Sequence, residues 1–494
     1  MESEVSSWVL VFFLITFISL LITLFIFQVK QRVSLCTCRI CQTYTTSAWS
    51  TQFDNLCDWY THLLQKSPTK TIHVHVLGNI ITANPCNVEH MLKTRFENYP
   101  KGKIFSSVLS DFLGQGIFNV DGETWRFQRK IACLELGRAS IGSYAFQVVK
   151  YEIESSLIPL LLSFLGKQEK GFLDLQEVFK NFSFDIICKF SLGLDPDCLE
   201  SSLSMSELAL SLDLASKLSA ERATAVSPWT WKIKRMLNLG TEKHLREAIK
   251  KVNILAQELI YLKQKLGFSK DNKDLLSKFM DNINDDEKYL RDIIISFLLA
   301  GRDTVASALT GLFRLLSGNP ETVAAILDEA DRVIGLTQKL TTLEQIQKLH
   351  YLQATIHESM RLYPPVQLDS KYSLEDDTLP DGTFVRKGTR VTYHPYAMGR
   401  IEEIWGLDCL EFKPERWLKD GVFLQRSPFE YPVFQAGPRV CLGKEVALVE
   451  LKAVALSLLR QFHFEPMAPI CTIRFTPGLT ATLQGGLPVF IQKR

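Results

Sequence analysis

The sequence of 494 residues has no excess of charge of either sign, because 56 Lys and Arg offset 54 Asp and Glu and leave a net charge of +2. A strongly basic balance, which nucleic-acid-binding domains carry, is therefore missing. Glycine (26 residues) and proline (19 residues) are too few for a collagen-like or linker-rich chain. We expect one large domain or two ordinary ones, with a deep core and no nucleic-acid partner.

Cysteine is too sparse for a disulfide scaffold, since eleven residues are spread over the chain without a dense framework. Cys36, Cys38 and Cys41 are closely spaced, and three such thiols can indicate zinc or an iron–sulfur cluster. No fourth Cys or His follows before Cys57. We therefore interpret them as juxtamembrane thiols, open to lipidation, rather than as a metal site.

Phosphate-binding patterns are also missing. The sequence contains no Gly-x-Gly-x-x-Gly, no Walker lysine loop and no internal repeat. The chain itself is expected to bind neither a nicotinamide nor a nucleotide.

One long uncharged run is present, from Trp8 to Phe27. Its twenty residues would span the roughly 30 Å hydrocarbon core as a helix. Basic residues follow the run at Lys30, Arg32 and Arg39, which predicts a cytosolic body. We predict a single-pass transmembrane anchor over residues 1–29. A cleaved signal peptide is the alternative, disfavoured because no small-residue cleavage site follows.

Beyond the anchor, residues 30–65 are interpreted as a juxtamembrane linker without proline, and residues 66–494 as the folded catalytic domain. Alternation from Thr71 predicts two strands joined at Gly78-Asn79, with His73 and His75 on one half-exposed face rather than in a metal site.

Helices dominate the middle of the chain, over residues 145–365. A long helix is predicted from about Asp286 to Ser317, stopped by Gly318-Asn319-Pro320. A final apolar helix, Lys444 to Arg460, precedes a short β-rich tail. The expected fold class is mainly α with a smaller β region.

The most informative segment is Phe434-Gln-Ala-Gly437-Pro-Arg439-Val-Cys441-Leu-Gly443. Its glycines let the backbone turn around the sulfur, and the following helix points its positive end there, which favours a thiolate. A thiolate, a nearby arginine and an aromatic wall suit an iron–porphyrin with Cys441 as axial ligand.

This segment resembles the haem-binding loop of the cytochrome P450 superfamily, and it matches every fixed position of that pattern. The resemblance implies haem b held by Cys441, with Phe434, Gly437 and Arg439 around it. It also implies O2 as co-substrate and electrons from NADPH through the membrane-bound NADPH–cytochrome P450 reductase, in the endoplasmic reticulum membrane.

Three further segments resemble family signatures. Glu358-Ser-Met-Arg361 would pair with Arg416 of Pro414-Glu-Arg-Trp to stabilise the core behind the haem. Ala300-Gly-Arg-Asp303-Thr304 resembles the oxygen-activation motif, in which Thr304 bonds back to the helix and opens a kink. There Thr304 would hold the activated oxygen, and Asp303 would relay protons. Trp125-Arg-Phe-Gln-Arg129 would bind a haem propionate, and Lys371 is a further candidate for that role.

Several stretches, among them Tyr363-Pro-Pro-Val-Gln-Leu and Val391-Thr-Tyr-His-Pro-Tyr-Ala-Met-Gly-Arg400, resemble the plant fatty-acid ω-hydroxylase branch. The resemblance implies an apolar pocket lined by segments 105–118, 296–300, 364–368 and 475–479. A jasmonate–amino acid conjugate is the alternative substrate, since it also offers a carboxylate and an apolar tail.

Two other classes stay open. A haem-thiolate isomerase or dehydratase would need neither O2 nor a reductase, and such enzymes typically lack the threonine motif. A non-catalytic membrane haem protein is the second, disfavoured by the presence of Cys441, Asp303 and Thr304.

Overall fold

The computed structural model describes most of the chain after residue 35. The described residues are 36–137, 140–166, 172–195, 205–266, 274–283, 286–336, 342–467 and 473–494, with Thr16 and Ser19. Apart from those two residues, the predicted anchor from Trp8 to Phe27 lies outside the described residues.

Helices make up most of the described chain, as the sequence predicted. They are α2 (Arg39–Thr45), α3 (Leu56–Lys66), α4 (Pro85–Glu89), α5 (Gly102–Leu113), α6 (Gly122–Leu136), α7 (Ile141–Glu152), α8 (Ile158–Gly166), α9 (Leu175–Ile187), α10 (Met205–Thr224), α11 (Pro228–Leu237), α12 (Gly240–Leu266), α13 (Leu275–Met280), α14 (Glu287–Leu298), α15 (Thr304–Leu316), α16 (Pro320–Ile334), α17 (Leu343–Gln347), α18 (His350–Leu362), α19 (Pro395–Met398), α20 (Glu402–Trp405) and α21 (Lys444–Gln461).

The strands form small sheets. The largest has the order β1 (Thr71–Val74), β2 (Asn79–Thr82), β7 (Arg390–Tyr393) and β4 (Asp369–Tyr372), and its β2–β7 pair is parallel. A second sheet has the order β10 (Phe462–Pro466), β13 (Pro488–Lys493) and β3 (Leu173–Asp174). Three two-stranded ribbons are β5 (Asp377–Thr378) with β6 (Phe384–Val385), β8 (Leu418–Lys419) with β9 (Val422–Phe423), and β11 (Phe475–Thr476) with β12 (Thr482–Leu483).

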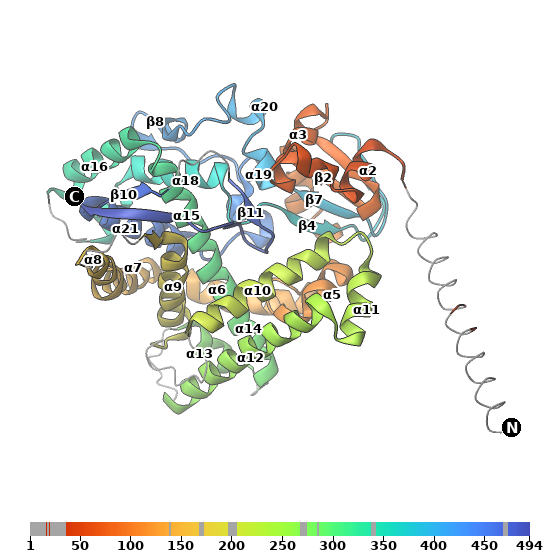
Figure 1. Cartoon of the computed structure of the whole chain (residues 1–494), viewed down its shortest axis with the longest axis horizontal. Helices are drawn as coiled ribbons and strands as arrows, with labels where there is room; N and C mark the ends of the chain where they lie inside the picture. Colours follow the sequence, from red (N-terminus) through yellow and green to blue (C-terminus); the bar gives the residue numbers. More distant parts are fainter. Residues whose placement is uncertain are drawn as a thin grey trace.

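The core consists of three clusters of buried apolar side chains. One lies among α7, α9, α15, α18 and α21, a second among α5, α6, α10, α12 and α14, and a third between the four-stranded sheet and α3. In Figure 1 the sheet with α2 and α3 lies to one side of the helical body, and α15 runs through the middle of that body.

The predicted long helix is present but contains one wide turn. It begins after Asp286, whose carboxylate accepts a hydrogen bond from the Tyr289 backbone N–H at 3.0 Å. It continues through α14, a π-helical turn at Leu299–Asp303, and α15. Among the described residues this is the one helix long and apolar enough to cross a membrane, but 67% of its most apolar window is buried inside the protein. It is the central helix of the folded body.

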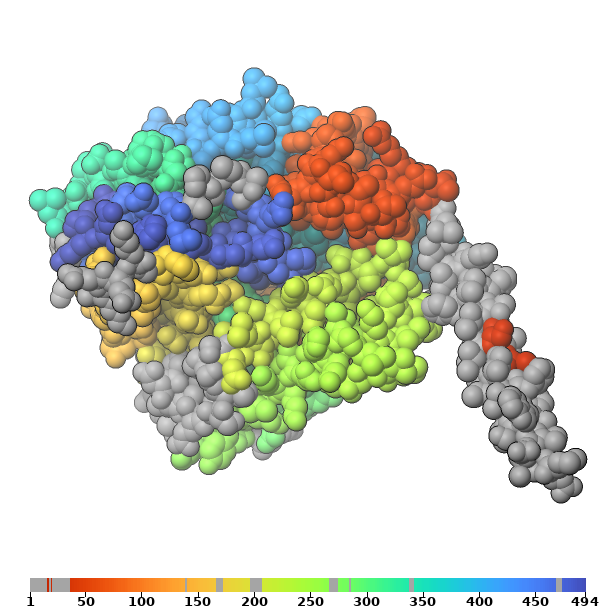
Figure 2. Space-filling model, viewed as in Figure 1, coloured from red at the N-terminus to blue at the C-terminus, as the bar shows by residue number. Residues whose placement is uncertain are grey.

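Residues 30–65 are interpreted from sequence as a linker, but α2 lies within this range and α3 ends one residue beyond it, and both helices pack near the four-stranded sheet. Cys41 is buried, and the half-buried Ile40 and Tyr44 contact the cluster beneath the sheet. The Tyr44 hydroxyl donates a hydrogen bond to the Thr224 carbonyl at 2.7 Å, joining this segment to the end of α10. In Figure 2 the red and orange surface of residues 36 to about 100 adjoins the yellow-green surface of α10 and α11.

The sequence offered no fourth potential metal ligand near Cys36, Cys38 and Cys41, but the structure places His75 beside them. His75 follows β1 and begins a 3₁₀ turn over His75–Leu77, so it leaves the strand face on which the alternation placed it. Its imidazole Nδ1 lies 3.6 Å from the Cys36 Sγ. Sequence distance concealed this contact, since 39 positions separate the two residues.

One buried carboxyl makes the stability of the fold depend on pH. Glu450 lies in α21, where the Ser183 hydroxyl donates a hydrogen bond to its Oε1 at 3.2 Å. Burial raises the pKa of Glu450 from 4.5 to about 8, against the smaller opposing effect of Ser183. The folded protein therefore holds this proton more tightly than the unfolded chain does. The resulting stabilisation is complete below about pH 4.5 and is lost as the pH rises through about 8.

We expect Glu450→Gln to flatten that dependence. The neutral amide keeps the acceptor for Ser183, so the variant should match the parent at about pH 5 and exceed its stability by a few kcal/mol at about pH 9. Thermal unfolding at both pH values measures the difference. Glu445→Gln, at an exposed position on the same helix, is the control and should show no such pH-dependent gain.

Candidate active site

The loop that carries Cys441 is held by its own backbone and by close packing. Two short 3₁₀ turns, Pro432–Phe434 and Gly437–Arg439, precede α21. The Cys441 N–H donates a hydrogen bond to the Phe434 carbonyl at 2.8 Å. Gly437 has φ +64°, and a Cβ there would overlap the carbonyl oxygen of Leu92. Only glycine allows this approach, so the loop is fixed relative to the segment around Leu92.

The thiol of Cys441 is less acidic than the sequence predicted. The Cys441 side chain is exposed to solvent in the protein structure. Enough protein surrounds the sulfur, however, to desolvate its ionised form. This burial raises the pKa of Cys441. The Gly443 backbone N–H and the charges of Arg129 and Lys444 act in the opposite direction but do not outweigh it. A cation bound at the sulfur would favour its thiolate form.

Arg129, whose charge acts on this sulfur, and Arg439, two positions before Cys441 in the chain, differ in their partners. Arg439 donates hydrogen bonds to the Asp121 Oδ1 at 2.7 Å and to the Val120 carbonyl at 2.9 Å, and its guanidinium lies 4.5 Å from the ring centre of Trp125. Arg129 is half-buried on α6 and, among the described residues, makes no ion pair with a carboxylate. Burial lowers the pKa of Arg129, while the nearby thiols of Cys133 and Cys441 favour its charge. Among the described residues, Arg439 therefore has a carboxylate partner and Arg129 has none.

Lys371 lies in a buried charge cluster centred on Asp369. The Lys371 Nζ is 3.1 Å from the Asp369 carboxylate, and the Lys101 Nζ is 2.5 Å from it. Gln435, the residue after Phe434, donates a further hydrogen bond to Asp369 at 3.0 Å. Burial lowers the pKa of Lys371, although Asp369 opposes that shift. Lys371 therefore has a protein partner, and the cluster joins the cysteine loop to β4.

The wide turn of the central helix forms around Thr304, as predicted from sequence. The Thr304 hydroxyl donates a hydrogen bond to the Ala300 carbonyl at 2.6 Å, one turn back. The turn lies close against α9, where a Cβ at Gly301 would overlap the side chain of Ile187. A local widening between α14 and α15 results.

Asp303 borders a pocket on the side of α9 and α10. Its Oδ1 accepts a hydrogen bond from buried Arg302 at 2.7 Å, and the same guanidinium nitrogen contacts Asp213 at 2.9 Å. Lys180 completes the chain of charges at 2.6 Å from Asp213. Burial raises the pKa of Asp303, with Arg302 opposing it. The pocket measures about 390 Å³, and Asp303, Asp213 and Lys180 are all among its lining residues.

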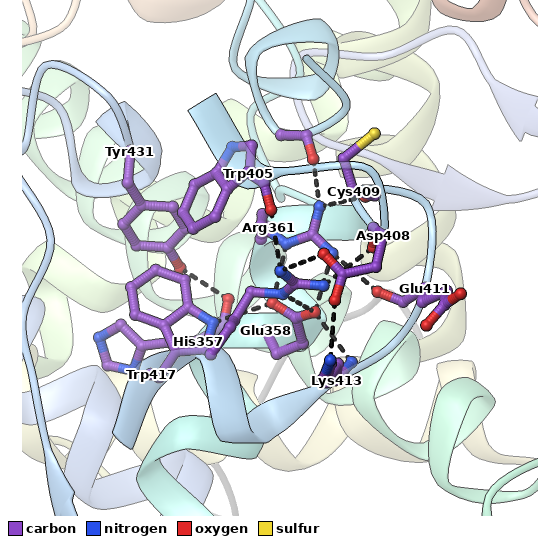
Figure 3. Close-up of polar contacts among 12 residues, drawn as sticks. His357, Glu358, Arg361, Trp405, Asp408, Cys409, Glu411, Lys413, Trp417 and Tyr431 are labelled. Carbon is purple, nitrogen blue, oxygen red and sulfur yellow. Dashed lines mark hydrogen bonds and ion pairs between the residues drawn. The ribbon is translucent and has the colours of Figure 1, made fainter. Parts of the chain in front are cut away.

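The predicted ion pairs of Glu358 are present, and both Glu358 and Arg361 are fully buried (Figure 3). Arg361 donates to the two carboxylate oxygens of Glu358 at 2.8 Å each. The Arg416 Nε lies 2.8 Å from Oε1, and the Trp417 indole N–H donates to Oε2 at 2.9 Å. Burial alone would raise the pKa of Glu358, but Arg361 and the other donors outweigh it and hold that pKa below its usual range.

Comparison with known proteins identifies the family. A family model described as Cytochrome P450 matches residues 49–485. The chain is 54% identical over 496 residues to cytochrome P450 94C1 of Arabidopsis thaliana, covering 99% of each chain. It is 47% identical to cytochrome P450 94B1 of the same plant, covering 89% of this chain and 88% of the relative. It is 42% identical to cytochrome P450 94A1 of Vicia sativa, covering 88% and 86%.

The chain belongs to the cytochrome P450 family. It is therefore a monooxygenase of the class that uses O2 at a haem iron held by a cysteine thiolate.

The residues around Cys441 fit a P450 haem. Among the described residues, the one group of three or more potential ligands from Cys, His, Asp and Glu lies elsewhere, so Cys441 offers a single thiolate. A single protein donor suits an iron whose equatorial ligands come from a porphyrin. Arg129 and Arg439 would supply positive charge for haem propionates, with Trp125 as a further donor. Phe434 is the first residue of the cysteine loop, and its ring centre lies 5.7 Å from the Lys444 Nζ.

Sequence reasoning missed three partners of two P450 site residues, Asp303 and Lys371. Arg302 and Asp213 were not linked to Asp303, nor Asp369 to Lys371. Two of these partners carried a local signal: Arg302 precedes Asp303, and Asp369 shares a strand face with Lys371 two positions away. Asp213 lies on another helix and carried no local signal.

Removing the shared carboxylate of the P450 core tests the role of the Glu358 network. Glu358→Ala leaves Arg361 and Arg416 without their buried counter-ion, so we expect a loss of about 3–5 kcal/mol in the free energy of unfolding and a low haem content. Urea unfolding measures the loss of stability, and haem absorbance measures the haem content.

The control is Lys413→Ala, which removes an exposed ion pair with Asp408 nearby but keeps the backbone donor to Glu358. It should change stability by about 1 kcal/mol or less, and an equal loss in the two variants would contradict this role.

Proposed function

We propose that this P450 hydroxylates the terminal carbon of fatty acids. The observation that supports the proposal is the apolar cluster against which Leu442 of the cysteine loop packs. Leu442, next to Cys441, packs on the same cluster as the half-buried side chains of Phe105, Val108, Leu299 and Leu479. These four residues all lie within three of the segments expected to line the pocket, 105–118, 296–300 and 475–479. A long alkyl chain requires such an apolar lining.

The haem, when bound, supplies an oxidant able to hydroxylate an unactivated C–H bond. The chain's own residues then have two tasks: to aim the substrate and to move protons. A terminal methyl has stronger C–H bonds than the methylenes beside it. Oxidation at that end therefore requires a narrow approach that keeps the methylenes away, which bulky side chains such as Phe105 and Leu479 would provide.

Proton movement is assigned to Asp303 and Thr304. The Asp303 carboxyl lies between Arg302 and the lining of the 390 Å³ pocket, and its raised pKa favours a carboxyl that takes up and releases a proton. The Thr304 hydroxyl donates to Ala300, so its oxygen lone pairs are available to accept a hydrogen bond within the widened turn. We infer that protons reach the reaction from the pocket through Asp303 and that Thr304 orients the oxygen being activated.

Electrons are proposed to come from NADPH through the membrane-bound NADPH–cytochrome P450 reductase, because this chain lacks the nucleotide-binding patterns sought in the sequence. A single N-terminal anchor in the endoplasmic reticulum membrane would confine both partners and raise their effective concentration. The catalytic domain would face the cytosol.

The role of Thr304 is tested by Thr304→Ala. Loss of the hydroxyl should uncouple the reaction, so that NADPH consumption continues, hydrogen peroxide accumulates and product per NADPH falls several-fold. Thr310→Ala is the matched control, since Thr310 also lies in α15 and donates to the carbonyl one turn back, from Thr310 to Ala306 at 2.7 Å. The control should keep its coupling, and a fully coupled Thr304→Ala enzyme would contradict the assignment.

The substrate class is tested with the full chain and its reductase in membranes. A series of saturated fatty acids and a jasmonate–amino acid conjugate are supplied separately, and the hydroxylated position is read by mass spectrometry. We expect terminal hydroxylation of fatty acids that requires both O2 and NADPH, with no product from Cys441→Ser.

Exclusive turnover of the conjugate would favour the alternative substrate. Conversion of a lipid hydroperoxide without O2 and NADPH would instead indicate an isomerase or dehydratase.

A further inference from the structure

Four potential metal ligands meet at the edge of the four-stranded sheet, remote in sequence from the haem loop. Cys36 and Cys38 precede α2, Cys41 lies in its first turn, and His75 begins the 3₁₀ turn after β1. The three sulfur atoms and one imidazole nitrogen all lie within 4.8 Å of one another. The His75 Nδ1 is 3.6 Å from the Cys36 Sγ and 3.9 Å from the Cys38 Sγ.

The two sulfur–nitrogen distances are close to those around one tetrahedral ion. With Zn–S bonds of about 2.3 Å and Zn–N bonds of about 2.0 Å, tetrahedral angles place sulfur and nitrogen roughly 3.6 Å apart, and two sulfurs roughly 3.8 Å apart. A backbone donor already supports one thiol, since the Val76 N–H points to the Cys41 Sγ at 3.4 Å. Hydrogen bonds of this kind orient the ligands of metal sites.

We propose that Cys36, Cys38, Cys41 and His75 bind a structural Zn²⁺ ion. Three thiolates and one imidazole are an established ligand set for structural zinc, and four protein ligands leave no open position for catalysis. An iron–sulfur cluster fits less well, because such clusters take four cysteines or two cysteines with two histidines. The burial is graded, with Cys41 buried, Cys36 and Cys38 half-buried and His75 exposed, so an ion can enter from solvent.

The ion would hold residues 36–41, at the start of the continuously described chain, against the four-stranded sheet. It would cross-link residues 39 positions apart, and therefore restrain α2 against the β1–β2 hairpin. The cross-link lies in a part of the chain that has no proline between residue 1 and residue 67, so the metal would add a stiffness that proline does not supply there. This proposal does not depend on the substrate proposed above.

The test uses the full-length chain, purified in detergent with its haem and with a tag that contains no histidine. Zinc and iron are measured together by mass spectrometry, and X-ray absorption at the zinc edge identifies the ligands. We expect about one zinc per chain, with three sulfur neighbours at about 2.3 Å and one nitrogen at about 2.0 Å.

Matched variants separate this site from other zinc. His75→Ala should lose most of the zinc while keeping its haem, and His75→Cys should retain the zinc with four sulfur neighbours. His73→Ala is the control, because the His73 ring lies 5.4 Å from that of His75 but is not in the ligand group. Trypsin should cleave after the exposed Arg39 several-fold faster in His75→Ala than in His73→Ala.

Three results would overturn the proposal. The first is a haem-loaded parent protein without zinc, and the second is a zinc spectrum dominated by oxygen ligands. The third is an acyl group on Cys36 or Cys38 in a zinc-free protein, which would indicate that lipidation is the use of these thiols. The absorption measurement needs no variant, so it decides the matter even if a substitution prevents folding.

Discussion

The position of the Cys441 sulfur is constrained by a short loop whose neighbouring residues pack into all three parts of the core. Phe434 contacts the cluster around α15 and α21, Ala436 belongs to the cluster beneath the four-stranded sheet, and Leu442 contacts the cluster around α14. Because each cluster is close-packed, the loop cannot shift without disturbing one of them. The backbone bond from Cys441 to Phe434 then sets the direction of the sulfur.

Three carboxylates of the structure are each paired with two cationic side chains. Asp369, Glu358 and Asp213 each receive at least two cationic partners, and each group of charges joins elements that are distant in sequence. Burying an isolated carboxylate is strongly unfavourable, whereas a carboxylate shared by two bases keeps its charge. The pKa of Glu358 and of Asp213 is accordingly held below its usual range, although burial alone would raise it.

Asp303 differs from these structural carboxylates. It shares its guanidinium partner, Arg302, with Asp213, and its pKa is raised because Arg302 does not outweigh the effect of burial. The two acids compete for one base, so the proton affinity of Asp303 is high for an aspartate. A group of this kind beside a pocket is suited to proton transfer, while Glu358, with its full set of partners, is suited to holding the core together.

The sequence by itself determined the family, the wide turn at Thr304 and the pairing of Glu358 with Arg361, because each rests on residues within one turn or one loop. Local spacing is sufficient where the physical contact is local. Only the tertiary structure decided the contact of Lys101 with Asp369, the contact of Asp213 with Arg302 and the approach of His75 to three cysteines. These depend on burial and on contacts across dozens or hundreds of positions, and neither quantity is encoded in the spacing of neighbouring residues.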